Sequence, residues 1–303
     1  MPNKPELVTE TDRASRTGSN IGSGYAGHFS CRSFVGLAGE LCIAASDEEP
    51  EAVKRLIDAG ADIETRSCRS PTKGMTILHV AAWHGWSVNA IKLLIEADAD
   101  VNATDSRGNT PLILATRNLV VSLPLVEFLI QSGANVNKKC DKGMTALMHA
   151  TLHDNTTQTV RTLIDASADV AAKDKMGWTA LMHATRKKRE CKKTIELLIE
   201  AGSDANAAHN HGGTALSSAS YNGHAATVKL LIEAGADVNA RDEAGWTPLL
   251  CSSINGHTQV VKLLLEAGAN VNIQDRLERT PRSVASNNGH RETAKLLKEA
   301  GAR

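Results

Sequence analysis

Residues 245–275 read GWTPLLCSSINGHTQVVKLLLEAGANVNIQD, and this stretch predicts two short helices joined by a turn. Thr247 is a favoured residue immediately before a helix, and Pro248 suits the first helical position, where no backbone hydrogen bond would form in any case. A Gly-His pair then interrupts the helix. The apolar residues that follow recur at the i, i+3, i+4 spacing of a second, amphipathic helix, and Gly268 stands where a helix can end in a left-handed residue.

Units of the same pattern recur along the chain. The opening threonine is found at Thr76, Thr110, Thr145, Thr179, Thr214, Thr247 and Thr280, with separations of 34, 35, 34, 35, 33 and 33 residues. A more divergent unit begins near Gly39 and has Leu41-Cys42-Ile43 in place of the usual opening. The sequence therefore predicts about eight repeats, starting near residues 39, 76, 110, 145, 179, 214, 247 and 280.

This period, together with the Thr-Pro-Leu openings, resembles the ankyrin repeat. The resemblance is carried by Thr110-Pro111-Leu112, Thr247-Pro248-Leu249, Leu78-His79-Val80-Ala81-Ala82, Gly235-Ala236-Asp237-Val238-Asn239 and Gly268-Ala269-Asn270-Val271-Asn272. It implies an all-α solenoid of helix-turn-helix repeats with β-hairpin tips. It also implies a concave groove, formed by the tips and the first helices, that binds other proteins.

Composition divides the chain into two parts. Residues 1–30 are rich in Ser, Gly, Thr and charge, which predicts a disordered leader, and residues 31–303 are expected to form one array. The leader contains a G-x-G-x-x-G run at residues 22–27, but no strand precedes it, so a linker is favoured over a phosphate-binding loop. We expect Phe34, Val35 and Leu37 to cover the open end of the first repeat.

Charge and cysteine usage exclude several classes of protein. The formal net charge is zero, which disfavours a nucleic-acid binder that works by neutralising phosphates. The six cysteines are scattered without a C-x-x-C pair, as expected of reduced thiols, and no apolar run is long enough to cross a membrane. These features predict a protein of the cytoplasm, with the nucleus as an alternative location and with no cofactor.

Repeat length varies in an informative way. The link before Thr76 is four residues longer than the others and should protrude as an enlarged tip. The remaining variation lies between the opening threonine and the end of the second helix, and we place it in the turn between the two helices. Asp98 and Ser167 stand where other repeats end in Gly, so Ser167 should be strained by about 1 kcal/mol in the left-handed region.

Four of the nine aromatic residues, counting Trp, Tyr and Phe, fall at positions that the repeat register places in the groove. Large aromatic side chains flanked by Arg and His are typical of binding hot spots, although packing within the array is the alternative. The residues we predict to contact a partner are Trp83, Arg117, His153, Trp178, Arg186, Tyr221 and Trp246.

Three histidines form a second candidate site. His149 and His153 are four residues apart on one predicted helix, and His183 occupies the place of His149 in the next repeat. The H-E-x-x-H pattern of zinc enzymes is absent, and no Asp or Glu in the same short segment would orient an imidazole. Structural histidines are therefore favoured over a metal site or a catalytic group, and no catalytic residue is assigned.

A third candidate is the basic run at residues 186–193, which occupies the lengthened turn of the fifth repeat. A solvated surface is the simplest interpretation, and docking of an acidic partner is the favoured functional one. The residues that would contact such a partner are Arg186, Lys187, Lys188 and Arg189.

Together these patterns predict a protein–protein interaction module, namely a scaffold, an adaptor or an inhibitor. The alternative is a groove that binds or transforms a small molecule with His149, His153 and His183. An enzyme is disfavoured because the sequence contains no motif that is typical of a catalytic site. Neither a membrane nor a nucleic acid is an expected partner.

Overall fold

The computed structural model of the chain describes residues 34–47, 49–68, 72–118, 122–153, 156–187 and 191–302, and in these ranges the chain forms paired helices. The first helices of the pairs are α2 (Leu37–Ser46), α4 (Ile77–His84), α6 (Pro111–Arg117), α8 (Ala146–Thr151), α10 (Ala180–Thr185), α12 (Ala215–Asn222), α14 (Pro248–Ile254) and α16 (Pro281–Asn287). The second helices are α3 (Pro50–Asp58), α5 (Val88–Glu96), α7 (Leu123–Gln131), α9 (Thr157–Asp165), α11 (Lys192–Glu200), α13 (Ala225–Glu233), α15 (Thr258–Glu266) and α17 (Arg291–Glu299).

The opening threonines start the first helices as expected. The Thr247 hydroxyl accepts a hydrogen bond from the amide of Leu250 at 3.4 Å, and Pro248 occupies the first turn. The same contact is made by Thr110, Thr145, Thr179, Thr214 and Thr280. At Thr76 the His79 ring also takes part, because its Nδ1 accepts from the Thr76 amide at 3.2 Å.

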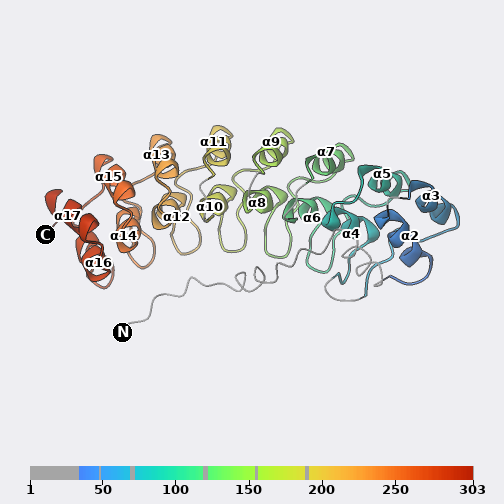
Figure 1. The fold of residues 1–303 in the computed structure, drawn as a ribbon, viewed down its shortest axis with the longest axis horizontal. Coiled ribbons are helices and arrows are strands. Elements are labelled where there is room, and N and C mark those ends of the chain that lie inside the picture. The colour runs from blue at the N-terminus through green and yellow to red at the C-terminus, as the bar shows by residue number, and fades with distance from the viewer. Residues whose placement is uncertain are drawn as a thin grey trace.

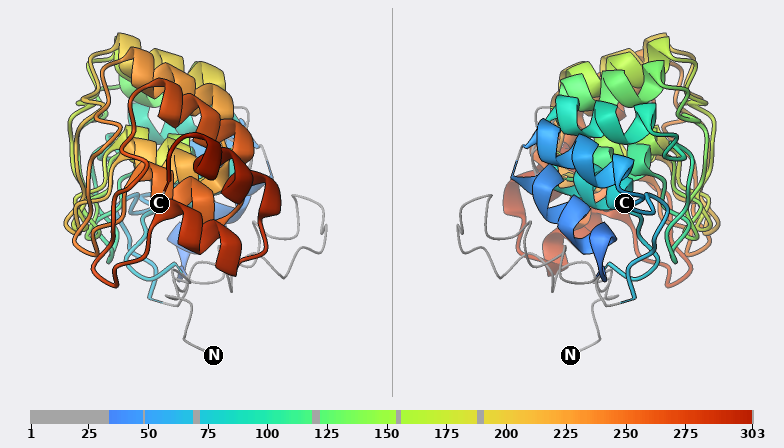
Figure 2. Two further views of the ribbon diagram at one scale, coloured as in Figure 1. Left: turned by 90° about the vertical axis from the view of Figure 1, so that its left-hand side faces the viewer. Right: turned by 90° about the vertical axis from the view of Figure 1, so that its right-hand side faces the viewer.

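The helices form two layers that follow an arc, with the even-numbered helices on its inner side (Figure 1). Each first helix packs against the first helices of the neighbouring repeats, and the second helices stack in the same way. The loops project together from one side of the stack (Figure 2). We call the surface formed by the first helices and the loops before them the inner face. No described helix is long and apolar enough to cross a membrane.

The core is a continuous layer of small and branched apolar side chains between the two helix rows. Leu112, Leu147, Leu181, Leu216 and Leu249 occupy the same position in successive repeats, and each is at most 1% exposed. Every repeat buries these side chains against its neighbours, which explains why the array is elongated rather than folded around one centre.

The inter-repeat loops are tight turns rather than strand pairs. In the loop before α6, the Asp105 amide donates to the Asn109 carbonyl at 2.9 Å, and the Asp105 carboxylate accepts from the amides of Arg107 and Asn109 at 2.8 Å each. One isolated bridge, between Ala208 and Thr214, is the only strand-type pairing in the described ranges. The tips expected from the resemblance are therefore turns closed by a backbone bond, without paired strands in the described ranges.

Variation in repeat length lies where the sequence predicted it. All the second helices contain nine residues, so the additional residues of the middle repeats fall between the paired helices. In the long first link, the Ser67 amide donates to the Met75 carbonyl at 2.8 Å. Residues 69–71 lie outside the described ranges, so the protrusion of this link stays a prediction.

Three residues other than Gly adopt a left-handed backbone. Asp98 and Ser167 have φ values of 67° and 64°, which confirms the geometry predicted for these helix ends. Glu278 has a φ of 60° in the last inter-repeat loop, at a position where earlier loops have Gly. That third site was not anticipated.

Asparagine side chains link successive loops. Asn102 Nδ2 donates to the Gly133 carbonyl at 3.0 Å, and its Oδ1 accepts from the Asn135 amide at 2.7 Å. The same two bonds are made by Asn137, Asn206 and Asn239. We call this series the asparagine ladder. It is interrupted in the loop before α10, where Ala171 occupies the position and its methyl group can form neither bond.

The two ends of the array differ. Phe34 is buried, as expected of a covering residue, but Val35 and Leu37 are 81% and 41% exposed, so the prediction that they also cover the first repeat is wrong. Both precede or begin α2 on its solvent side. At the other end, Lys298 and Glu299 are exposed on α17, as the sequence suggested. The leader assigned to residues 1–30 lies outside the described residues.

Candidate functional site

The seven residues predicted to contact a partner lie on the first helices, or immediately before or after them, and the structure groups some of them in pairs. The Arg117 guanidinium lies over the Trp83 ring at 5.4 Å, and the Arg186 guanidinium lies over the Trp178 ring at 4.7 Å. Trp246 pairs instead with Arg279, at 5.3 Å. A cation over an aromatic face stabilises the positions of both side chains.

Trp178 is the centre of the densest group. Its ring stacks on His209 at 4.7 Å with an interplanar angle of 10°, and the His183 ring lies 5.7 Å away. Trp178 comes from the loop before α10, His209 from the loop before α12, and Arg186 from the end of α10. His209 was not predicted from the sequence, although it replaces the Asp found at this loop position before α6, α10, α14 and α16.

Exposed apolar side chains occur in the repeats on either side of Trp178. Apart from residues near the two ends of the array, the large apolar side chains with the greatest exposure are Leu152 at 39%, Met176 at 52% and Tyr221 at 44%. All three belong to the fourth to sixth repeats. The Tyr221 carbonyl accepts from Asn255 Nδ2 at 2.9 Å, so its backbone is fixed while the phenol faces solvent. Met176 was not predicted, because only its exposure distinguishes it.

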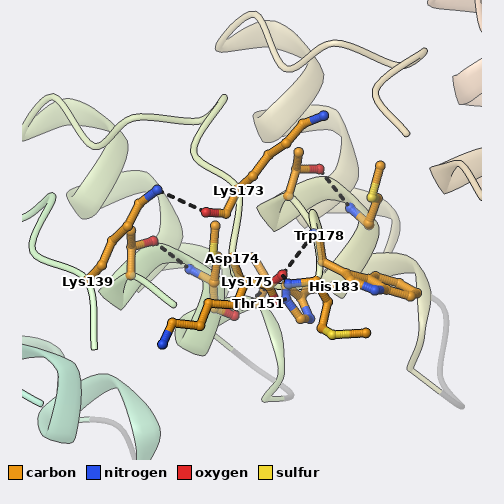
Figure 3. A network of polar contacts seen from close by, with 12 residues as sticks. Lys139, Thr151, Lys173, Asp174, Lys175, Trp178 and His183 are labelled. Carbon is orange, nitrogen blue, oxygen red and sulfur yellow. Dashed lines mark hydrogen bonds and ion pairs between the residues drawn. The ribbon is translucent and has the colours of Figure 1, made fainter. Parts of the chain in front are cut away.

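The structure gives His183 an acidic partner. Nε2 of His183 lies 3.0 Å from Oδ2 of Asp174, and Oδ1 of Asp174 accepts from the amides of Met176 and Trp178 (Figure 3). Burial opposes ionisation of this carboxyl, but the hydrogen bonds from His183 and the two amides outweigh it and lower the pKa of Asp174. The expectation that no acid would orient an imidazole is therefore wrong, because the loop folds back and brings Asp174 beside α10.

His149 occupies the equivalent place on α8 without such a partner. Its side chain is 7% exposed, and Nε2 has no hydrogen-bond partner in the described structure. Burial lowers the pKa of His149 to about 3, with further contributions from nearby Arg117, His183, His153 and Lys142. This imidazole is therefore neutral throughout the physiological range.

The loop before α8 explains the difference. The position of Asp174 is occupied there by Cys140, which is buried, and the surrounding backbone is the same: the Cys140 amide donates to the Met144 carbonyl at 3.0 Å, as the Asp174 amide does to the Trp178 carbonyl. A thiol is a weak acceptor and carries no charge that could stabilise an imidazolium.

The structure places the three histidines in different surroundings. His149 and His183 are buried in the helix stack, whereas His153 is half-buried at the end of α8 and its carbonyl accepts a hydrogen bond from Lys187 Nζ. A hollow of about 350 Å³ lies elsewhere, between α11 and α13, and is lined by Glu196, Ile199, Glu200, Leu230, Glu233 and Ala234. Among the described side chains, no three His, Cys, Asp or Glu converge as a metal site would require.

The basic run begins on the inner face. Arg186 is exposed above Trp178, and Lys187 Nζ lies 3.5 Å from Cys191 Sγ. Lys188 and Arg189 lie outside the described residues. Cys140 and Cys251 are buried free thiols, and burial raises the pKa of the Cys251 thiol to about 12.

Comparison with known proteins agrees with the repeat architecture. A family model described as Ankyrin repeats (3 copies) matches residues 41–140, 120–209, 189–242 and 216–303. The chain is 36% identical over 114 residues to the B-cell lymphoma 3 protein homolog of Mus musculus, an alignment that covers 36% of this chain and 24% of the relative. It is also 36% identical over 121 residues to the neurogenic locus notch homolog protein 1 of Homo sapiens, covering 40% of this chain and 4% of the relative.

A third similar protein is alpha-latrotoxin-Lh1a of Latrodectus hasselti, which is 40% identical over 70 residues, or 23% of this chain and 5% of the toxin. The chain thus spans about a quarter or less of the curated relatives that it matches.

Proposed function

The chain belongs to the ankyrin repeat family, and from this premise we propose that it is a protein–protein interaction module that binds its partner on the inner face. It would act as a scaffold, an adaptor or an inhibitor by presenting a rigid surface. The contact residues that we assign are Trp83, Arg117, His153, Trp178, Arg186, Tyr221 and Trp246.

The observation that carries this proposal is the exposure of Leu152, Met176 and Tyr221 in the fourth to sixth repeats, which flank the Trp178–Arg186 pair along the array. Leu152, Met176 and Tyr221 remain exposed in the middle of the array, where a chain with no partner would favour polar residues. Arg186 and His209 hold the Trp178 ring in place, so little side-chain entropy would be lost when a partner covers it.

The test is affinity capture of native proteins with the wild type and with the double variant Trp178→Ala, Tyr221→Ala. We expect the double variant to lose the captured partner while its thermal unfolding remains cooperative. The matched control is Leu277→Ala, which removes an apolar side chain that is 71% exposed but lies in the last inter-repeat loop. Capture that survives the double substitution would contradict the assignment of the inner face.

We also propose that the protein works in the cytoplasm, with the nucleus as the alternative. The scattered cysteines, which form no C-x-x-C pair, support a reducing compartment. Imaging of the full chain, tagged and expressed in its native host, checks this location.

A further inference from the structure

A continuous strip of cations crosses the inner face of the fourth and fifth repeats. Residues 138–153 and 172–187 contain seven Lys or Arg and two carboxylates, whereas the equivalent segment of the seventh repeat, residues 240–255, contains one cation and two carboxylates. The chain as a whole has zero formal net charge. The excess is therefore local to these two repeats. We define the basic strip as Lys139, Lys142, Lys173, Lys175, Arg186 and Lys187.

Contacts between the two loops join these residues into one surface. Lys139 Nζ donates to the Lys173 carbonyl at 2.9 Å (Figure 3). The Lys175 amide donates to the Lys142 carbonyl at 3.0 Å. Arg186 extends the strip across the Trp178 ring. The cations thus run from the loops to the end of α10.

Three cations of the strip have no carboxylate partner among the described residues. Asp174 is engaged with His183 and with two backbone amides, and only 8% of its side chain is exposed. The exposed cations Lys142, Lys175 and Arg186 form no ion pair with any described carboxylate. Clustered like charges repel each other, so an external acid is the group that would lower the free energy of this surface.

Apolar side chains are interleaved with the cations. Met176 follows Lys175 directly, Leu152 lies at the end of α8, and Tyr221 lies at the end of α12. A ligand that satisfies both features carries acidic groups together with at least one apolar side chain, which is the chemistry of an acidic peptide segment.

We propose that the basic strip binds an acidic linear segment of a partner protein, with an apolar side chain of that segment seated beside Trp178 and Met176. This inference rests on the proposed function and specifies the class of partner. A nucleic acid fits less well, because the Trp178 ring already stacks on His209 and carries Arg186, so it is not free to stack on a base. The exposed Met176 and Leu152 side chains also have no counterpart on a phosphate backbone.

A random 12-residue peptide library displayed on phage and selected on the full chain at about 150 mM salt tests the proposal directly. We expect the selected peptides to be enriched in Asp and Glu and to contain a large apolar residue. A fluorescent copy of the best peptide should bind the double variant Lys175→Glu, Arg186→Glu about tenfold or more weakly, because charge reversal replaces attraction by repulsion.

The matched control is Arg276→Glu. Arg276 lies four residues before Thr280, as Lys175 lies four residues before Thr179, and its amide makes the same inter-loop bond, to the Ala244 carbonyl. This variant should leave peptide affinity unchanged. Thermal unfolding of each variant, compared with the wild type, shows whether the array is intact, and Lys142→Glu provides a second exposed substitution if the double variant is unfolded.

Neutral or basic selected peptides would overturn the proposal, and so would failure to select any binder or equal weakening by Arg276→Glu. A labelled single-stranded oligonucleotide that binds more tightly than the best peptide and displaces it would reassign the strip to nucleic acid. If native capture remains sensitive to Trp178→Ala, Tyr221→Ala while no acidic peptide binds, the proposed function stands and this inference alone fails.

Discussion

The fourth and fifth repeats contain the same heptapeptide, Thr-Ala-Leu-Met-His-Ala-Thr, at residues 145–151 and 179–185, and both copies form a six-residue helix capped by the threonine. Their histidines nevertheless differ. His183 is paired with Asp174, whereas His149, in the repeat that has Cys140 at the equivalent loop position, has a pKa of about 3. The chemistry of the helix residue is therefore decided nine residues earlier, in the loop.

The comparison separates two roles of an inter-repeat loop. Its backbone is nearly the same in both copies, so the loop spaces the helices equally well with either residue. The side chain five residues before the opening threonine, which is Asp174 or Cys140, determines the charge and the hydrogen bonding around the histidine of the following helix. Changing this one residue should alter the properties of a repeat without altering the repeat geometry.

The largest effect is expected from Asp174→Cys, which would make the fifth repeat resemble the fourth. The substitution removes the acceptor of two amides and of the buried His183 ring, so we expect a loss of about 3 kcal/mol in the free energy of unfolding. Urea titration followed by circular dichroism measures it. The matched control is Asp242→Cys, because Asp242 accepts from the amides of Ala244 and Trp246 but has no histidine partner.

The control should cost about 1 kcal/mol less than Asp174→Cys, and this difference reports the histidine contact. Equal losses would show that the Asp174–His183 pair contributes nothing beyond the turn. The reverse substitution, Cys140→Asp, should stabilise the fourth repeat and raise the pKa of His149, which NMR titration of the imidazole would detect.

The second effect depends on pH. His149 has a pKa of about 3 in the folded chain and 6.5 as the reference value of an unfolded residue. Between these values the unfolded state binds a proton that the folded state does not, so the stability is complete above pH 6.5 and falls as the pH drops toward 3. The variant His149→Leu removes this loss. The difference in free energy of unfolding between the variant and the wild type should therefore be about 2 kcal/mol more favourable to the variant at pH 5 than at pH 7.5.

Leu is a suitable replacement because Leu114 occupies the same position in the third repeat and is 1% exposed. Urea unfolding of both proteins at the two pH values provides the measurement. Since the pKa values of His79, His84 and His209 are also lowered by burial, only the difference between the variant and the wild type isolates His149. The same gain at both pH values would contradict a neutral, desolvated imidazole.

A smaller effect is expected where the asparagine ladder is interrupted. Ala171→Asn would place a side chain where it can donate to the Gly202 carbonyl and accept from the Asp204 amide, by analogy with Asn137. We expect a gain of about 1 kcal/mol, and Asn206→Ala in the next loop should cost a similar amount. Thermal unfolding checks both variants. No change in either would mean that the ladder bonds contribute nothing beyond the loop backbone.

The smallest effect concerns Ser167. Gly at this position should raise the free energy of unfolding by about 0.5–1 kcal/mol, because the left-handed backbone no longer opposes a Cβ atom. A Cβ built at the equivalent Gly133 or Gly202 meets no atom within 4 Å, so backbone strain rather than crowding is the cause. A small rise in melting temperature is the expected observation. A lower melting temperature would show that the greater backbone freedom of unfolded Gly outweighs the strain.

Much of the architecture was predictable because it depends on local rules. A Thr-Pro pair such as Thr247-Pro248 is a local signal for the start of a helix. The spacing of the repeats placed the additional residues in the turns between the paired helices. The left-handed backbone of Ser167 followed from its alignment with glycines. By contrast, the contact of Asp174 with His183 depends on how a loop folds back over a helix, which periodicity does not encode.

The sequence predicted which face holds the candidate site better than it predicted which side chains contact each other there. The repeat register placed Trp178 and Arg186 on the same face, and the structure brings them within cation–π distance. Stacking of His209 and exposure of Met176 depend on the path of two neighbouring loops. Exposure of Val35 was missed for a related reason, since an apolar residue near a terminus can cover the core or face solvent with the same sequence.

The gap at Ala171 lies within the surface crossed by the basic strip. Repeats interact mainly with their neighbours, so a missing contact between two loops lowers the cooperativity with which the N-terminal and C-terminal halves unfold. A ligand that spans the loops before α8 and α10 and reaches the end of α12 would bridge this gap. Such a ligand would couple the unfolding of the two halves of the array. Amide hydrogen exchange near Ala171 would then slow in proportion to the occupancy of the ligand.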